Sequence, residues 1–234
     1  MDGMINLNKP VGISSARALD RVRAITGQRR SGHAGTLDPA ADGVLVICLG
    51  RATKLVEAMM DQPKTYRAEA RLDVTSESFD SDRPLIPVAV ETPPSEAALR
   101  ESLRTFRGEI QQAPPAISAV KVGGRRAYAL THAGKPPELP RRTVRVDELE
   151  LLSHEWPRLT LRITCGRGFY VRALIRDIGA ALGCGGCLTG LTRLAVGPFR
   201  VQQAWSLDAL AKAAPADYLI ELPRVLALLG RPRP

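Results

Sequence analysis

Residues 32–55 read GHAGTLDPAADGVLVICLGRATKL, and this segment is the most informative part of the chain about its fold. Its second half contains the run from Val44 to Leu49, which is short, uninterrupted and apolar, as is typical of a buried strand. The first half is polar and rich in glycine, and Asp38 lies near its centre, directly before Pro39. The pattern predicts a loop at the edge of a sheet that leads into a buried strand.

The residues of this loop allow two interpretations. Gly32, Gly35 and Gly43 permit close approaches that a Cβ atom would block, so a bulky ligand could rest against the backbone. The simpler interpretation is a tight connection in which Asp38 starts a turn, because Asp before Pro commonly does so. Physical chemistry alone leaves both interpretations open.

Apolar periodicity predicts both strands and helices outside this loop. Before it, an apolar strand at residues 4–7 precedes a helix that Ser15 caps and Gly27 ends. The elements expected after it are a strand at 66–72, a helix at 97–106, strands at 144–152 and 159–165, and a helix at 170–182. Helices do not separate the strands regularly, so we expect an α+β protein with a mixed, mostly antiparallel sheet flanked by helices.

The composition indicates a polyanionic partner. The chain has 234 residues, enough for one large domain or two small ones, and its net charge is +9. Of its 33 cationic residues, 27 are Arg, whose planar fork pairs with phosphate and stacks on bases. A codon preference for Arg in a GC-rich genome would give the same composition, so charge alone does not identify the partner.

The sequence also predicts the compartment and the state of the cysteines. Residues 1–10 lack the basic start and apolar run of a signal peptide, and no stretch approaches the roughly 18 apolar residues of a membrane helix. We therefore expect a cytoplasmic protein in which the cysteines remain thiols. Cys184 and Cys187 form a CxxC, but no second pair accompanies it, and we expect no bound metal.

The stretch at 32–55 resembles the signature of the TruB family of pseudouridine synthases, and further stretches resemble the family's other motifs in the same order. These are KPVGISS at 9–15, KTYRA at 64–68, the segment from Arg107-Gly108 through QAPP at 112–115 to SAVK at 118–121, CGRGFYVRAL at 165–174, and LTRL at 191–194. An ordered set of motifs across residues 4–200 is far more specific than one short pattern.

The resemblance implies the pseudouridine synthase fold and names the residues of the site. Asp38 is expected to be the catalytic carboxylate, Tyr66 to stack on the target base and help remove its C5 proton, and Arg172 to keep Asp38 ionised. The substrate-binding residues that it implies are His33 against the RNA, Leu191 on the wall of the uracil pocket, Lys9 in support of the catalytic loop, and Tyr170 and Lys121 from the later motifs. Taken alone, Tyr66 could equally be a core aromatic.

The resemblance also implies the reaction, which is isomerisation of uridine 55 in the T loop of tRNA after the base is flipped out. The expected partner is therefore the tRNA T stem-loop, bound by a monomer that requires no protein partner and no membrane. The reaction consumes nothing, so no cofactor is expected. Asp38 could act as a nucleophile at ribose C1′, remove a ribose proton or stabilise developing charge, and the sequence does not choose between these routes.

The chain departs from the family pattern in two places. The acidic stretch that follows the second strand in the family reads TSESFDSD at 75–82, and no Gly follows it. Bacterial members usually continue into a small RNA-binding PUA domain, whereas here we expect a catalytic domain at 1–225, a short tail at 226–234 and no PUA domain. A proline-rich stretch after Lys121 resembles the RNA-binding thumb loop, and the basic residues around it are Arg125, Arg126, Lys135, Arg141 and Arg142.

Two other functions fit the same sequence. One is a non-catalytic RNA-binding or RNA-folding protein on the same scaffold, because a fold does not guarantee an activity. The other is a synthase that acts on a different RNA, such as the related enzymes guided by small RNAs. Intact Asp38, Tyr66 and Arg172 argue against the first.

Overall fold

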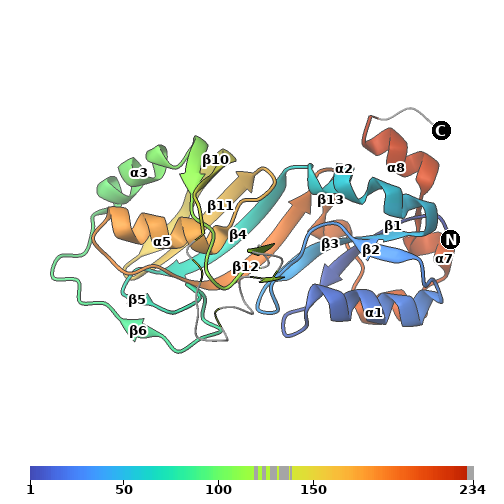
Figure 1. Cartoon of the computed structure of the whole chain (residues 1–234), viewed down its shortest axis with the longest axis horizontal. Coiled ribbons are helices and arrows are strands. Elements are labelled where there is room, and N and C mark those ends of the chain that lie inside the picture. Colours follow the sequence, from blue (N-terminus) through green and yellow to red (C-terminus); the bar gives the residue numbers. More distant parts are fainter. Residues whose placement is uncertain (119–120, 123–124, 127–130, 132–136, 138, 231–234) are drawn as a thin grey trace. The chain divides into compact units, whose positions relative to one another are not determined.

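The structure is a computed structural model that describes residues 1–118, 121–122, 125–126, 131, 137 and 139–230 (Figure 1). Its residues form two compact units. The first contains Met1–Tyr66 and Leu191–Pro234, and the second contains Arg67–Gly190.

The first unit is built on a sheet with the apolar run of the signature stretch at its centre. Its strands are β1 (Gly3–Lys9), β2 (Ser31–His33), β3 (Asp42–Leu49), β12 (Cys187–Val196, in this unit from residue 191), β13 (Phe199–Arg200) and β14 (Ile220–Glu221). Antiparallel pairs join β1 to β3 and β14, β2 to β3, and β13 to β12. β3 and β12 pair in parallel, with Arg193 opposite Gly43.

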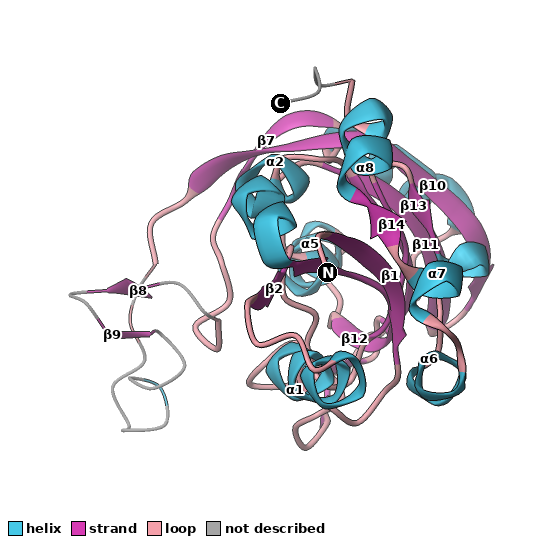
Figure 2. Cartoon of the chain, turned by 90° about the vertical axis from the view of Figure 1, so that its right-hand side faces the viewer, coloured by secondary structure: helices cyan, strands magenta, loops and turns pink. Residues whose placement is uncertain are grey.

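Helices cover both faces of this sheet. They are α1 (Ser15–Thr26), η1 (Gly50–Leu55), α2 (Val56–Met60), η2 (Val201–Gln203), α6 (Leu207–Lys212), α7 (Pro215–Tyr218) and α8 (Leu222–Leu228). Figure 2 shows α1 and α6 on one side of β1, and α2 and α8 on the other.

Alternate residues of β3 enter two different cores. Leu45 and Ile47 pack with residues of α1 and α6, whereas Val44 and Val46 pack with residues of α2 and α8. Because both of its faces are buried, the strand reads as an unbroken apolar run rather than as an alternating one. This confirms the prediction made from the sequence.

The helix α1 begins one residue earlier than the sequence predicted. Its N-cap is Ser14, whose hydroxyl accepts a hydrogen bond from the Arg17 amide. Ser15 was expected to cap the helix, but its hydroxyl instead exchanges two hydrogen bonds with the backbone of Leu37. Gly27 ends the helix in the left-handed conformation, with φ of 66°, as predicted.

The second unit combines an antiparallel sheet with two longer helices. Its elements are β4 (Lys64–Arg71, in this unit from residue 67), β5 (Val74–Thr75), β6 (Ile86–Pro87), α3 (Glu96–Thr105), β7 (Gly108–Gln112), β8 (Lys121–Val122), β9 (Arg125–Arg126), β10 (Arg142–Glu155), β11 (Arg158–Cys165) and α5 (Val171–Ala181). The order of the larger sheet within this unit is β4-β11-β10-β7. β10 pairs antiparallel with both β7 and β11.

The architecture is therefore α+β, with a mixed and mostly antiparallel sheet flanked by helices, as the sequence predicted. The expected helices at 97–106 and 170–182 are α3 and α5, each within a residue of its predicted ends. The helices within the described residues include none that is long and apolar enough to cross a membrane.

Candidate active site

The loop that carries Asp38 is anchored on both sides of that residue. On one side, the Ser15 hydroxyl accepts from the Leu37 amide at 2.8 Å and donates to the Leu37 carbonyl at 3.0 Å. On the other, the Gly12 amide donates to the Pro39 carbonyl at 2.8 Å. Both anchors come from the motif at 9–15, so two stretches recognised separately in the sequence form one structural unit around a partly exposed Asp38.

Lys9 supports the same region from a buried position. Its side chain is fully buried, and Nζ donates to the carbonyls of Pro10 at 2.8 Å and Ile13 at 2.9 Å. Burial lowers the pKa of this ammonium group, while the carboxylates of Asp42 and Asp38 act in the opposite direction. The contacts favour the supporting role expected for Lys9 over a direct part in chemistry.

Arg193 is a residue of this region to which the sequence assigned no role. It lies in β12 with 1% of its surface exposed, and its guanidinium donates to three backbone carbonyls. The acceptors are Val44 at 2.7 Å, Gly35 at 3.0 Å and Thr36 at 3.4 Å. The signal available in the sequence was a single Arg inside the otherwise uncharged LTRL strand.

The backbone of Arg193 also explains one of the loop glycines. Gly43 has φ of 100°, and a Cβ added there would lie 2.3 Å from the Arg193 carbonyl oxygen. The close approach that the sequence suggested is thus made by a neighbouring strand. An added Cβ at Gly32 would lie no closer than 3.9 Å to the nearest side chain, so the structure does not require a glycine there.

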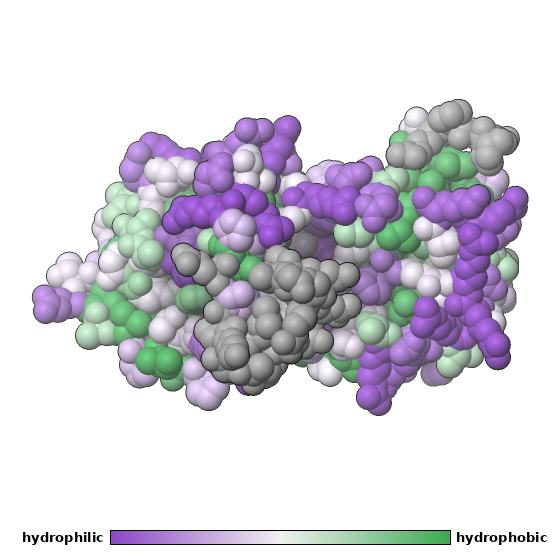
Figure 3. Space-filling model, in the orientation of Figure 1, coloured by the Kyte–Doolittle hydropathy of each residue, from purple (hydrophilic) through white to green (hydrophobic). Residues whose placement is uncertain are grey.

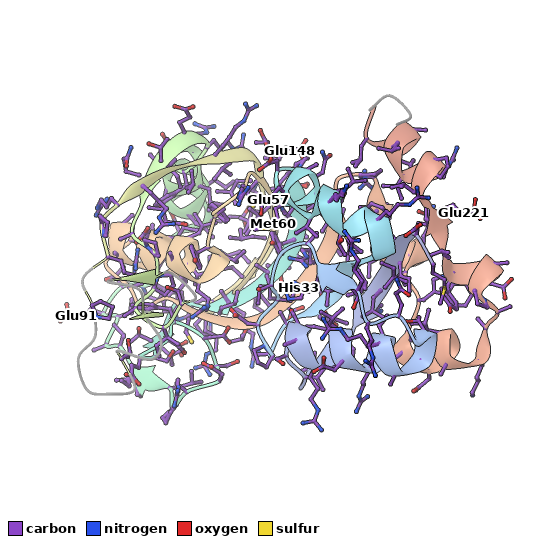
Figure 4. The ribbon with its side chains drawn as sticks, turned by 45° about the vertical axis from the view of Figure 1, so that its right-hand side comes forward. His33, Glu57, Met60, Glu91, Glu148 and Glu221 are labelled. Carbon is purple, nitrogen blue, oxygen red and sulfur yellow. The ribbon has the colours of Figure 1, made fainter. Side chains whose placement is uncertain are left out.

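His33 ends β2 beside this loop (Figure 4). Its Nδ1 atom is buried and has no hydrogen-bond partner within the described part of the chain. Burial is the main cause of a lowered pKa for this imidazole, and the positive charge of Arg193 adds to the effect. Both effects favour the neutral form of the ring.

This environment predicts that the protein loses stability on acidification. The folded pKa of His33 lies below its usual value of 6.5, so the unfolded chain binds the proton first. The contribution of His33 to stability is then complete above pH 6.5 and falls as the pH drops from there through the folded pKa. Urea unfolding between pH 8 and pH 5 should show a weaker pH dependence for His33→Gln than for the wild type.

An unchanged pH dependence in His33→Gln would contradict the environment described for His33.

The second unit holds the other motif residues. Gln112 clamps the backbone of Tyr170, since its side chain accepts from the Tyr170 amide at 2.8 Å and donates to the Tyr170 carbonyl at 3.1 Å. Tyr170 is the N-cap of α5, and Arg172 lies in the first turn with 8% of its surface exposed. Arg172 donates to the carbonyls of Ser78 and Ile117, each at 3.1 Å.

Comparison with known proteins places these motifs in one family. Residues 23–171 match the family model "TruB family pseudouridylate synthase (N terminal domain)", and residues 172–225 match "tRNA pseudouridylate synthase B C-terminal domain". The chain belongs to the TruB family. It is 42% identical over 229 residues to "tRNA pseudouridine synthase B" of Burkholderia mallei (strain NCTC 10247), an alignment that covers 94% of this chain and 76% of that relative.

Other members of the TruB family and solved structures give the same result. The corresponding protein of Clostridium kluyveri is 38% identical, with 99% of this chain and 79% of that relative covered. The fold resembles the structure described as "Crystal Structure of a Cbf5-Nop10-Gar1 Complex", with a TM-score of 0.71 and 31% identity. That match covers 90% of this chain and 54% of the chain in the complex, so this protein spans about half of its structural relative. The predicted pseudouridine synthase fold is confirmed.

The TruB-family site residues that the sequence predicted are distributed over both units. Lys9, His33, Asp38, Tyr66 and Leu191 belong to the first unit, and Lys121, Tyr170 and Arg172 belong to the second. Within the first unit, the structure joins Lys9 to the region of Asp38. The pairing of Arg172 with Asp38 and the stacking role of Tyr66 stay predictions.

The predicted thumb loop of this TruB-family chain is described only in part. Lys121 lies in β8, which pairs with β9 so that Lys121 is opposite Arg126. Arg142 begins β10, directly after the exposed Arg141. Lys135 lies outside the described residues.

The cysteines of the CxxC are free thiols. Cys187 is buried and Cys184 is partly exposed. No group of three or more His, Cys, Asp or Glu side chains that could hold a metal ion occurs among the residues that the structure describes. Burial also raises the pKa of the Cys48 thiol, to about 12.

These differences in burial predict an order of alkylation. Only the thiolate reacts readily, so Cys48 should stay unlabelled in the native protein at pH 8 because it is buried and protonated. Cys184 should be labelled first by iodoacetamide, since it is the more accessible member of the CxxC. Peptide mass spectrometry before and after unfolding in guanidinium checks this, and native labelling of Cys48 at the rate of Cys184 would contradict it.

Proposed function

We propose that this TruB-family chain is a tRNA pseudouridine synthase that isomerises uridine 55 in the T loop of tRNA. The observation that carries the proposal is 42% identity, over 94% of the chain, to relatives named tRNA pseudouridine synthase B. The anchored Asp38 loop supports it, because it presents a carboxylate from a backbone that is hydrogen-bonded on both sides.

The proposed reaction rearranges one nucleotide without consuming a second substrate. The bond between ribose C1′ and uracil N1 breaks, the uracil turns, and C1′ bonds to C5 of the same base. The hydrogen on C5 leaves to water, and N1 gains a proton, so that the composition of the RNA is unchanged. The balance needs no oxidant, reductant or nucleotide, and we propose that the chain requires no cofactor.

Asp38 is the proposed catalytic residue. A carboxylate can attack C1′, remove a ribose proton or stabilise the positive charge that develops as the glycosidic bond breaks. Each route requires the ionised form, and we propose that the guanidinium of Arg172 keeps Asp38 ionised. Tyr66 is proposed to present its ring to the uracil and to assist removal of the C5 proton, with Leu191 on the wall of the pocket.

Binding must supply the free energy that flips the base out of the T loop. Unstacking a base costs a few kcal/mol, which contacts to the RNA backbone have to offset. The net charge of +9 favours such contacts. Exposed arginines include Arg17 and Arg21 on α1 and Arg29 and Arg30 after it, and hydrophilic side chains project from the surface around α1 (Figure 3).

We further propose that the chain acts in the cytoplasm as a monomer that recognises the T stem-loop directly, with His33, Tyr170 and Lys121 among its RNA contacts. A second candidate is action on another RNA within a larger assembly. The observation in its favour is the structural likeness to Cbf5, which is described in a complex with Nop10 and Gar1 and in an archaeal box H/ACA sRNP complex with Nop10. Activity of the purified chain on tRNA, without guide RNA or partner protein, distinguishes the two.

The test is to incubate the purified chain with an unmodified tRNA transcript and to map pseudouridine by mass spectrometry of nuclease fragments. The proposal expects pseudouridine at position 55 and none in a transcript that carries cytidine there. Product that appears only when a guide RNA is added would favour the second candidate.

A further inference from the structure

Arg193 is a buried cation that the proposed chemistry does not use. Its three acceptors are all backbone carbonyls, and they lie on both sides of Asp38 in the sequence. Gly35 and Thr36 precede the aspartate, and Val44 follows it. One guanidinium therefore bridges the two ends of the segment that carries the catalytic carboxylate.

The chemistry of the side chain suits this bridging role. Arg offers five N–H donors in a planar fork, so it can satisfy several carbonyls in different directions at once. Lys has a single flexible ammonium group and cannot reproduce that fork. Burying a cation costs free energy unless the cation makes its hydrogen bonds. Movement of the acceptor carbonyls away from the guanidinium would therefore be unfavourable, which favours a fixed loop backbone.

The strand that carries Arg193 also links the loop to the proposed uracil pocket. Residues two apart on a strand point to the same face, so Leu191 and Arg193 lie on one side of β12. Arg193 pairs with Gly43 across the parallel β12–β3 ladder, which fixes its place along β3. One short stretch of β12 therefore carries both the residue proposed for the pocket wall and the residue that holds the Asp38 loop.

We propose that Arg193 is a positioning residue for uridine isomerisation, which holds the backbone on both sides of Asp38 so that the carboxylate is fixed relative to Leu191 and the bound uracil. The inference rests on the proposed function and extends it. It assigns Arg193 no contact with the reacting atoms. A misplacement of about 1 Å can slow an enzymatic step about 10²-fold, so a change at this buried residue should affect turnover more than RNA binding.

The experiment compares Arg193→Lys and Arg193→Met with the wild type. Single-turnover isomerisation of saturating tRNA should slow about 10- to 100-fold in the Lys variant and further in the Met variant. Affinity for tRNA should stay within about threefold, because the residue is buried away from solvent. Amide hydrogen exchange in the free protein should speed up for residues 34–41 and remain unchanged in β10 and β11.

A control separates positioning from a general loss of stability. Leu99→Ala removes a fully buried side chain of α3 in the second unit and should lower the urea midpoint of unfolding because it leaves a cavity. Its single-turnover rate should nevertheless stay near that of the wild type at temperatures where it is folded. An equal slowing in Leu99→Ala and Arg193→Lys would overturn the proposal.

Two other results would also overturn it. One is a wild-type rate in folded Arg193→Met, and the other is unchanged exchange of residues 34–41 in both Arg193 variants. Absence of pseudouridine formation by the wild type would instead refute the proposed function, and the exchange measurement would still decide whether Arg193 holds the loop.

Discussion

Replacing Asp38 by Asn is expected to lower the rate of uridine isomerisation by at least about 10³-fold while leaving affinity for tRNA within about threefold. Asparagine keeps the size of the side chain and part of its hydrogen bonding. It removes the negative charge and the nucleophilic oxygen, so covalent attack, proton removal and charge stabilisation are all lost. The loop should keep its shape, because its anchors run from Ser15 and Gly12 to the backbone of Leu37 and Pro39.

The measurement uses T stem-loop RNA labelled with tritium at uridine C5, with tritium release followed beside a gel-shift titration. Asp20→Asn is the charge control, since it removes an equal charge from an exposed side chain of α1 that is paired to Arg23, and it should stay within about tenfold of the wild type. Tritium release by Asp38→Asn near the wild-type rate would show that another residue carries the reaction. Loss of both binding and folding would leave Asp38 as a structural turn residue.

A rise in salt concentration is expected to weaken tRNA binding strongly. A chain with a net charge of +9 that contacts several phosphates should lose about 10³-fold in tRNA affinity between roughly 50 and 200 mM monovalent salt. The physical cause is the release of counterions from each phosphate that a Lys or Arg neutralises. The slope of log Kd against log salt, measured by filter binding, reports the number of such contacts.

Single substitutions test whether individual arginines contribute to this salt dependence. If Arg141, at the end of the predicted thumb loop, contacts one phosphate, Arg141→Ala should reduce the slope by about one. Arg104→Ala is the matched control, because this Arg lies on α3 with its side chain 73% exposed and paired to Glu101. A dissociation constant independent of salt would contradict electrostatic recognition, and an equal loss of slope in both variants would contradict a specific thumb contact.

Much of the fold follows from local patterns in the sequence. The Val44–Leu49 run predicted a buried strand because it is short, continuous and apolar. That strand is β3, and each residue of the run enters one of two cores. The helix that Gly27 ends was predicted because its apolar residues lie at helical spacing and a glycine adopts the left-handed end conformation readily. Such features depend on neighbours within a few residues.

The details that the sequence did not predict depend on distant contacts. Both Ser14 and Ser15 can cap a helix, and the interaction of Ser15 with Leu37, 22 residues away, decides between them. The loop was expected to begin at residue 32, but Ser31–His33 pair with β3 as β2. Local propensity is weak for this short polar segment, so the neighbouring strand determines its structure.

The sequence predicted some residues of the candidate site and missed others, again because distant contacts are not visible in local patterns. Physical chemistry alone could not separate a catalytic Asp38 from a turn residue, and the family resemblance made that choice. Arg193 escaped notice because its partners lie about 150 residues earlier in the chain, so that no local pattern reveals them.

Conversion of uridine 55 of tRNA by means of Asp38 can be tested in cells. Pseudouridine is mapped across total tRNA from cells that lack the gene, and from the same cells complemented with the wild type or with Asp38→Asn. We expect pseudouridine at position 55 to disappear on deletion, to return with the wild type and to stay absent with the Asn variant. Persistence of pseudouridine at position 55 in the deletion strain, or its restoration by Asp38→Asn, would show that this chain does not modify uridine 55 through Asp38.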